Sequence, residues 1–82
     1  MTAVETRNRQ VLANLISELR QRLGLSQEKL ASKLGVSYQS VNRWENNRAV
    51  PSQMALKLIE AMLLKMGDRG ADLLNRYFPE EV

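Results

Sequence analysis

The side chains best suited to bind another molecule lie close together, between residues 37 and 43. The outward positions of this segment hold hydrogen-bond donors, acceptors and one cation, on Ser37, Tyr38, Gln39, Asn42 and Arg43. A glutamine or an asparagine can make two hydrogen bonds to adenine, and an arginine can make two to guanine. The set could therefore bond the edges of DNA bases, if one helix presents these side chains on a single face.

The side chains on which most catalytic and metal sites depend are missing. The 82 residues include no histidine and no cysteine, so the commonest general base, the commonest metal ligand and the thiolate nucleophile are absent. No paired carboxylates and no phosphate-binding glycine loop stand in for them. We therefore expect no enzyme, no cofactor and no metal site. The lack of cysteine also suits a reducing cytoplasm.

Charge and length agree with a small DNA-binding domain without proving one. The net charge is +3 and the pI is about 9.7, a balance that favours a polyanionic partner. A chain of this length makes one domain, here residues 1–82. Its apolar runs are too short to span a membrane, and residues 1–10 lack the apolar core of a signal peptide. We therefore expect no membrane association and a cytoplasmic location.

The first element that must position these side chains is a long helix over about residues 6–23. Its apolar residues recur at helical spacing and form one stripe: Val4, Val11, Leu12, Leu15, Ile16, Leu19 and Leu23. Gly24 ends it, because glycine adopts the left-handed conformation that closes a helix without strain.

Two short helices and a turn follow. Ser26 caps a second helix, whose inner face holds Leu30, Ala31 and Leu34; Gly35 ends this helix and Ser37 caps the third. Val41 and Trp44 hold the third helix to the core, although Trp44 as a base-stacking residue is the alternative. Two helices joined by a short turn with glycine form the helix-turn-helix arrangement, whose second helix enters the major groove.

The rest of the chain predicts two further helices. Ser52 caps a fourth, which has a wide apolar face made of Ala55, Leu56, Leu58, Ile59, Met62, Leu63 and Met66. Gly67 and Gly70 bracket a short link to a fifth helix over 71–78, which Pro79 terminates. No alternating β-branched runs occur, so we expect an all-α fold, a single bundle of five helices.

Residues from about 16 to 63 resemble the helix-turn-helix family of phage repressors and Cro proteins, with lambda-repressor-like DNA-binding domains. The segments that carry the resemblance are Leu25–Ala31, Gly35–Ser37, Val41–Arg48 and Pro51–Ser52. The resemblance implies a bundle of about five helices that binds double-stranded operator DNA as a homodimer. The segment after Leu64 does not match a family ending, and the C-terminal helix over about 68–78 is expected from its own residues. The family usually has glycine where this chain has Asn47, but asparagine tolerates the same left-handed conformation.

The resemblance also implies roles for individual residues. Tyr38, Gln39 and Arg43 fall where family members read base edges, with Asn42 beside them. The residues expected on the DNA backbone are Ser26, Gln27, Ser37, Ser40, Asn47 and Arg48. Arg20 and Glu45 fall where several family repressors have a buried ion pair.

Several alternatives stay open. Tyr38 and Arg43 could be solvated side chains without a role. The fifth helix could supply a dimer interface within 65–78 through Leu73, Leu74, Tyr77 and Phe78, or it could merely pack back over the fourth helix. The leading function is a sequence-specific transcriptional regulator, expected to be a repressor. An antitoxin that binds both a toxin protein and its operator, or a co-activator or adaptor module, are the alternatives.

Overall fold

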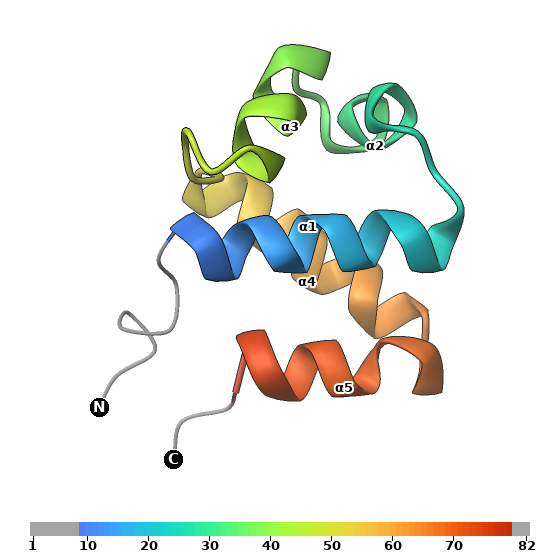
Figure 1. The fold of residues 1–82 in the computed structure, drawn as a ribbon. Coiled ribbons are helices and arrows are strands. Elements are labelled where there is room, and N and C mark those ends of the chain that lie inside the picture. Colours follow the sequence, from blue (N-terminus) through green and yellow to red (C-terminus); the bar gives the residue numbers. More distant parts are fainter. Residues whose placement is uncertain (1–8, 80–82) are drawn as a thin grey trace.

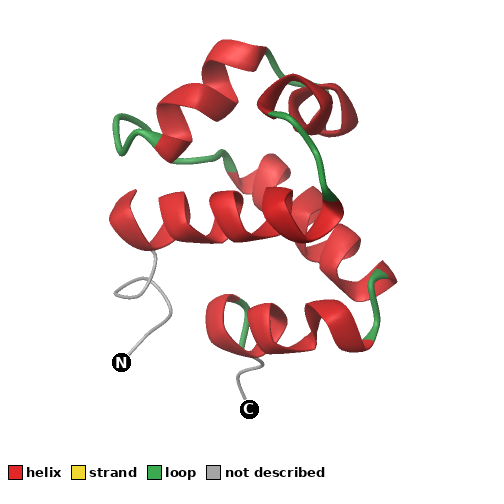
Figure 2. Cartoon of the chain, turned by 45° about the vertical axis from the view of Figure 1, so that its right-hand side comes forward, coloured by secondary structure: helices red, strands yellow, loops and turns green. Residues whose placement is uncertain are grey.

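A computed structural model describes residues 9–79 and places them in five α-helices, with no strand in that range (Figures 1 and 2). The helices are α1 (Arg9–Leu23), α2 (Gln27–Leu34), α3 (Tyr38–Glu45), α4 (Gln53–Lys65) and α5 (Asp68–Tyr77). The predicted all-α architecture is therefore confirmed. None of these five helices is both long enough and apolar enough to cross a bilayer.

Three serines start the short helices and α4 as the sequence predicts. The hydroxyl oxygens of Ser26, Ser37 and Ser52 each accept a hydrogen bond of 3.1 Å from the backbone N–H three residues further along. Such a cap satisfies one of the N–H groups that a helix start leaves unpaired and stabilises the helix by about 1 kcal/mol. The first residues of α2, α3 and α4 are thus set by local chemistry as well as by packing.

One hydrophobic core joins all five helices. Its fully buried side chains include Ile16, Leu19, Leu30, Val41, Ile59, Leu63 and Leu73. Trp44 is 5% exposed and belongs to this core, as its spacing from Val41 predicts, so it is not available to stack on a base. Figure 1 shows α1 running between the α2–α3 pair and α5. The helix predicted to contact DNA bases, α3, therefore lies at one end of the bundle and α5 at the other.

The boundary of the fifth helix differs from the prediction. Gly70 lies within α5, which begins at Asp68, and does not bracket a link. A Cβ at residue 70 would come within 2.5 Å of the carbonyl oxygen of Leu63. Glycine is therefore present because the backbones of α4 and α5 approach closely here, not because the chain turns. At the other end, the predicted helix start near residue 6 and the apolar Val4 lie outside the described residues.

Polar contacts that the sequence did not predict fix α5 to α1. Nη1 and Nη2 of Arg22 donate to the two carboxylate oxygens of Asp72, at 2.6 and 2.8 Å. Nη1 of Arg22 also donates to the carbonyl of Arg69, and the Arg69 guanidinium donates in return to the carbonyl of Arg22. The hydrogen bonds from Arg22 lower the pKa of Asp72 to about 2.

Candidate nucleic-acid interface

A tight turn sets α3 across α2. Three residues, 35 to 37, separate the two helices. Gly35 has a φ of 71°, its N–H donates to the carbonyl of Ser32, and the N–H of Val36 donates to the carbonyl of Ala31 at 3.0 Å. Ala31 is only 2% exposed, and its small side chain lets α3 approach closely. This geometry is the predicted helix-turn-helix.

The outer face of α3 presents side chains that nothing else in the described part of the chain engages. Gln39 and Arg43 are exposed, and Tyr38 is 47% exposed. Within residues 9–79, Gln39 and Arg43 make no side-chain hydrogen bond or ion pair. They lie one helical turn apart, so both can meet the same groove without breaking an existing contact.

Asn42 is held differently from its neighbours on α3. Its Nδ2 donates to Oε1 of Gln27 at 3.2 Å, and its Oδ1 accepts a bond of 3.1 Å from Nδ2 of Asn46. Nε2 of Gln27 donates in turn to Oε1 of Glu45 at 3.1 Å. Both amides that the sequence assigned to DNA contact, Asn42 to bases and Gln27 to phosphate, are therefore bonded to each other. A base contact by Asn42 would have to replace these bonds.

Arg20 and Glu45 are brought together by the packing of α1 against α3. Nε of Arg20 lies 2.7 Å from Oε2 of Glu45, and Nη2 lies 3.1 Å from Oε1. The side chains are 25% and 10% exposed, respectively. The hydrogen bonds with Glu45 raise the pKa of Arg20 above its usual value. The remaining Nη1 of Arg20 donates to the carbonyl of Leu25, so this one guanidinium also orders the α1–α2 connection.

The loop after α3 starts with a left-handed asparagine. Asn47 has a φ of 66°, as its place in a position usually held by glycine predicts. Its N–H donates to the carbonyl of Trp44, and the N–H of Arg48 donates to the carbonyl of Arg43 at 2.9 Å. Nδ2 of Asn47 donates to Oε1 of Gln10 at the start of α1, while the Arg48 side chain is exposed.

The serines assigned to the DNA backbone have structural partners at the helix starts. Ser26 and Ser37 cap α2 and α3, and the hydroxyl of Ser40 lies 3.0 Å from that of Ser37. Gln10 and Asn46 also take part in this polar framework. The bonds of Asn46 to Asn42 have the helical spacing of four residues, which the sequence could indicate, whereas the bond between Gln10 and Asn47 joins distant segments and could not be predicted. The free first N–H groups of α2 and α3 lie beside these serines and suit an anion.

Comparison with known proteins agrees with this geometry. The helix-turn-helix family model matches residues 16–63, the segment from the middle of α1 to the last turn of α4. An uncharacterized HTH-type transcriptional regulator of Bacillus subtilis (strain 168), YgzD, is 45% identical over 58 residues, which cover 70% of this chain and 88% of that protein. No solved structure matches the chain significantly.

Proposed function

The chain belongs to the helix-turn-helix family of DNA-binding transcriptional regulators, and on that premise we propose that it represses transcription by occupying an operator with α3 in the major groove. The observation that carries the proposal is the pair Gln39 and Arg43, exposed, one turn apart and without partners in the described chain. Tyr38 stands beside them at the start of the same helix. The protein acts by binding alone, without catalysis or cofactor, in the cytoplasm.

The backbone contacts in this proposal flank α3. Arg48 meets phosphate on one side, with the N–H groups at the start of α2 and the side chain of Gln27 on the other. Helix starts attract anions because their N–H groups are unpaired and the helix dipole is positive there. Asn42 keeps α3 oriented through Gln27 and contributes less to base reading than Gln39 or Arg43 do.

We also propose a two-fold homodimer, because one domain of this size reads only one half-site and a linked second half-site binds at high effective concentration. Leu73 and Tyr77 are buried inside the monomer, so of the four residues considered for the interface Leu74 and Phe78 have surface left for a partner. Leu64 at the end of α4 is 63% exposed and adds apolar area. Fewer residues of the α5 segment can therefore contact a second subunit than its apolar pattern suggests.

Selection of bound sites from random duplex DNA tests the regulator proposal. A two-fold symmetric consensus is expected, because half-site spacing mirrors the symmetry of a dimer. The same selection with the Arg43→Ala variant should show no base preference at one position in each half-site. Recovery of random sequences by the unaltered protein would refute sequence-specific binding.

Sedimentation at several concentrations tests the dimer. Leu74→Glu should convert the dimer to a monomer, whereas Leu58→Glu, at an exposed position earlier on α4, should leave it intact. A dimer that is lost with Leu58→Glu and kept with Leu74→Glu would move the interface to the outer face of α4. A protein that stays monomeric at all concentrations and on DNA would remove the dimer altogether. The toxin-binding alternative is not favoured, because the family match and the relative YgzD both indicate a transcriptional regulator.

A further inference from the structure

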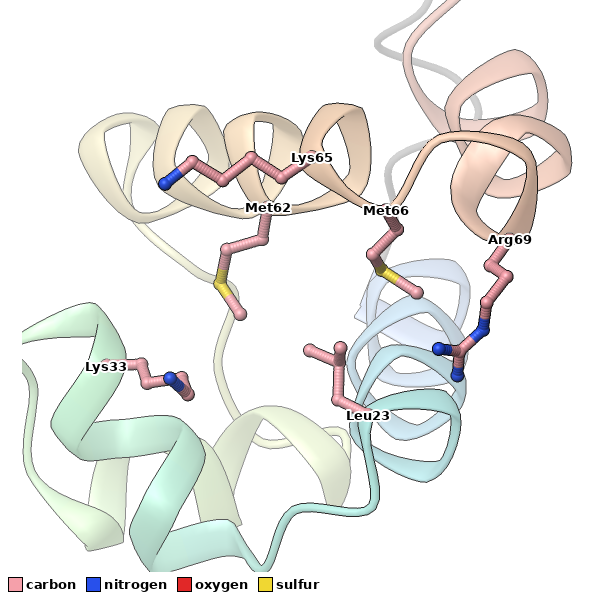
Figure 3. Close-up of a pocket in the computed structure, with 6 residues that line it drawn as sticks. All are labelled: Leu23, Lys33, Met62, Lys65, Met66 and Arg69. Carbon is pink, nitrogen blue, oxygen red and sulfur yellow. The ribbon is translucent and has the colours of Figure 1, made fainter.

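A pocket of about 590 Å³ opens on a part of the molecule that the proposed DNA contacts do not use. It lies between α2, the end of α1 and the junction of α4 with α5, and α3 contributes none of its lining (Figure 3). The lining residues are Leu23, Lys33, Met62, Lys65, Met66 and Arg69. Pockets for small ligands commonly measure about 300–1,000 Å³, so the volume suits a small molecule.

The apolar part of the pocket comes from three side chains. Leu23, Met62 and Met66 are half-buried and pack against the core. Figure 3 shows the two methionines directed from α4 toward the other walls of the pocket, with Leu23 opposite Met66. Methionine is unbranched and flexible, and can adapt to apolar ligands of different shapes. This surface can cover a short hydrocarbon chain or a ring.

The polar part of the pocket is entirely cationic. Lys33, Lys65 and Arg69 come from three different helices, and no acidic side chain lines the pocket. Within residues 9–79, Lys33 and Lys65 make no hydrogen bond or ion pair through their side chains. Arg69 donates to the carbonyl of Arg22, which holds its guanidinium near the end of α1. Figure 3 shows the Lys33 and Lys65 amines on one side of the pocket and Arg69 on the other. The two lysines are like charges, so an anion that binds on their side relieves their repulsion.

We propose that this pocket binds a small amphipathic anion, with the apolar body on Leu23, Met62 and Met66 and a carboxylate or phosphate on the side of Lys33 and Lys65. A DNA phosphate is the poorer occupant, because it is attached to sugar and would leave the apolar surface uncovered. An acidic peptide matches the charge, but the volume of the pocket corresponds to a single small ligand. The inference does not depend on the proposed DNA binding.

Methyl NMR of protein labelled at methionine provides the test. Octanoate and octyl phosphate are the probes for the two head groups, with octylamine as the cationic control. At least one anion should shift the methyl signals of Met62 and Met66 saturably, and octylamine should not. Met54, which is 73% exposed and outside the pocket, is an internal control whose signal should not move. The better of the two anions identifies the head group.

Charge variants with matched controls complete the test. Lys33→Gln and Lys65→Gln should each weaken the binding of the better anion by about threefold, the size expected of one exposed ion pair. Lys29→Gln and Lys57→Gln remove a lysine from the same helices outside the pocket and should leave the affinity unchanged. If the two control variants weaken binding as much as the two pocket variants do, the anion is attracted only by the overall positive charge, and the proposal is overturned. The absence of saturable shifts with either anion would also overturn it. A polyglutamate peptide is tested as a further probe, and shifts with this peptide alone would overturn the proposal too.

Discussion

Arg20 and Glu45 are joined by two hydrogen bonds, from Nε to Oε2 at 2.7 Å and from Nη2 to Oε1 at 3.1 Å, and these bonds tie α1 to the last residue of α3. Glu45 also accepts from Gln27 on α2. The Glu45 side chain is 10% exposed, and its carboxylate accepts hydrogen bonds from α1 and from α2. Both helices help to orient α3. Its loss should affect the angle of α3 as well as stability.

Arg20→Met should lower the free energy of unfolding by about 2–4 kcal/mol, because it leaves the mostly buried Glu45 carboxylate with only a neutral partner. The double variant Arg20→Met/Glu45→Leu should recover most of the loss, since apolar side chains often replace a buried ion pair at little cost. Urea denaturation measures both. Glu45→Leu alone completes the comparison, and a double variant as unstable as the sum of the two single variants would show that Arg20 and Glu45 contribute independently and that their pairing adds no stability.

Gln39→Ala and Arg43→Ala should each cost about 1–3 kcal/mol of binding energy on the selected operator and relax preference at one base position. Both residues are exposed and unpaired in the described chain, so truncation should not disturb the fold. Lys57→Ala on the solvent side of α4 is the control and should leave operator preference unchanged. Equal losses on operator and random DNA would mean that Gln39 and Arg43 do not read bases.

Arg48→Ala should weaken binding to all sequences by a similar factor and reduce the slope of log affinity against log salt by about one unit. The reason is that a side chain on phosphate displaces one counterion without reading a base. Titrations at several salt concentrations measure the slope. An unchanged slope would exclude Arg48 from the phosphate contacts.

Gly70→Ala should destabilise the protein, although alanine normally stabilises a helix relative to glycine by about 1 kcal/mol. The added Cβ would lie 2.5 Å from the carbonyl oxygen of Leu63 and 3.2 Å from its Cα, and backbone atoms cannot move aside cheaply. A net loss of about 1–3 kcal/mol is expected from such overpacking. Asn75→Ala, at an exposed site of the same helix, should show no loss. Thermal denaturation of the two variants makes the comparison, and a stabilised Gly70→Ala would contradict the close approach of α4 and α5.

The Asp72 carboxylate should make stability depend on acid pH. Arg22 lowers its pKa from 3.8 to about 2 in the folded protein. The ionised form therefore stabilises the fold fully above pH 4, and this contribution is lost as the pH falls from about 4 to 2. The melting temperatures of the natural protein and of Asp72→Asn should differ at neutral pH and converge near pH 2. In an Arg22→Gln background the difference should be small at every pH; a full difference there would mean that Arg22 is not its cause.

Local signals in the sequence predict the helix starts and the turn because their chemistry is local. Ser26, Ser37 and Ser52 cap helices with their own hydroxyls, and Gly35 and Asn47 adopt left-handed conformations that few other residues tolerate. These features need no knowledge of the distant chain. The core side of α3 also follows from the spacing of its apolar residues.

Features that depend on two distant elements could not be predicted in the same way. An apolar face on the fifth helix indicates that something covers Leu73 and Tyr77, but the sequence does not say whether a second subunit or the monomer does so. The sequence predicts a link at Gly70 because glycine usually breaks a helix, whereas the structure shows that glycine is required there by the close approach of the Leu63 carbonyl. The bonds of Asn42 to Gln27 likewise depend on how α2 and α3 cross.

The different states of the polar side chains on α3 have a consequence for how operator preference can diverge among descendants of this chain. The side chains of Gln39 and Arg43 make no hydrogen bond or ion pair within the described residues. Substitutions at these positions can therefore change the DNA sequence that the protein prefers without lowering the stability of the fold. Asn42 is part of the bonds that orient the helix, and its replacement carries a cost for the scaffold. New specificities should therefore arise first through residues 39 and 43, with residue 42 changing only together with Gln27.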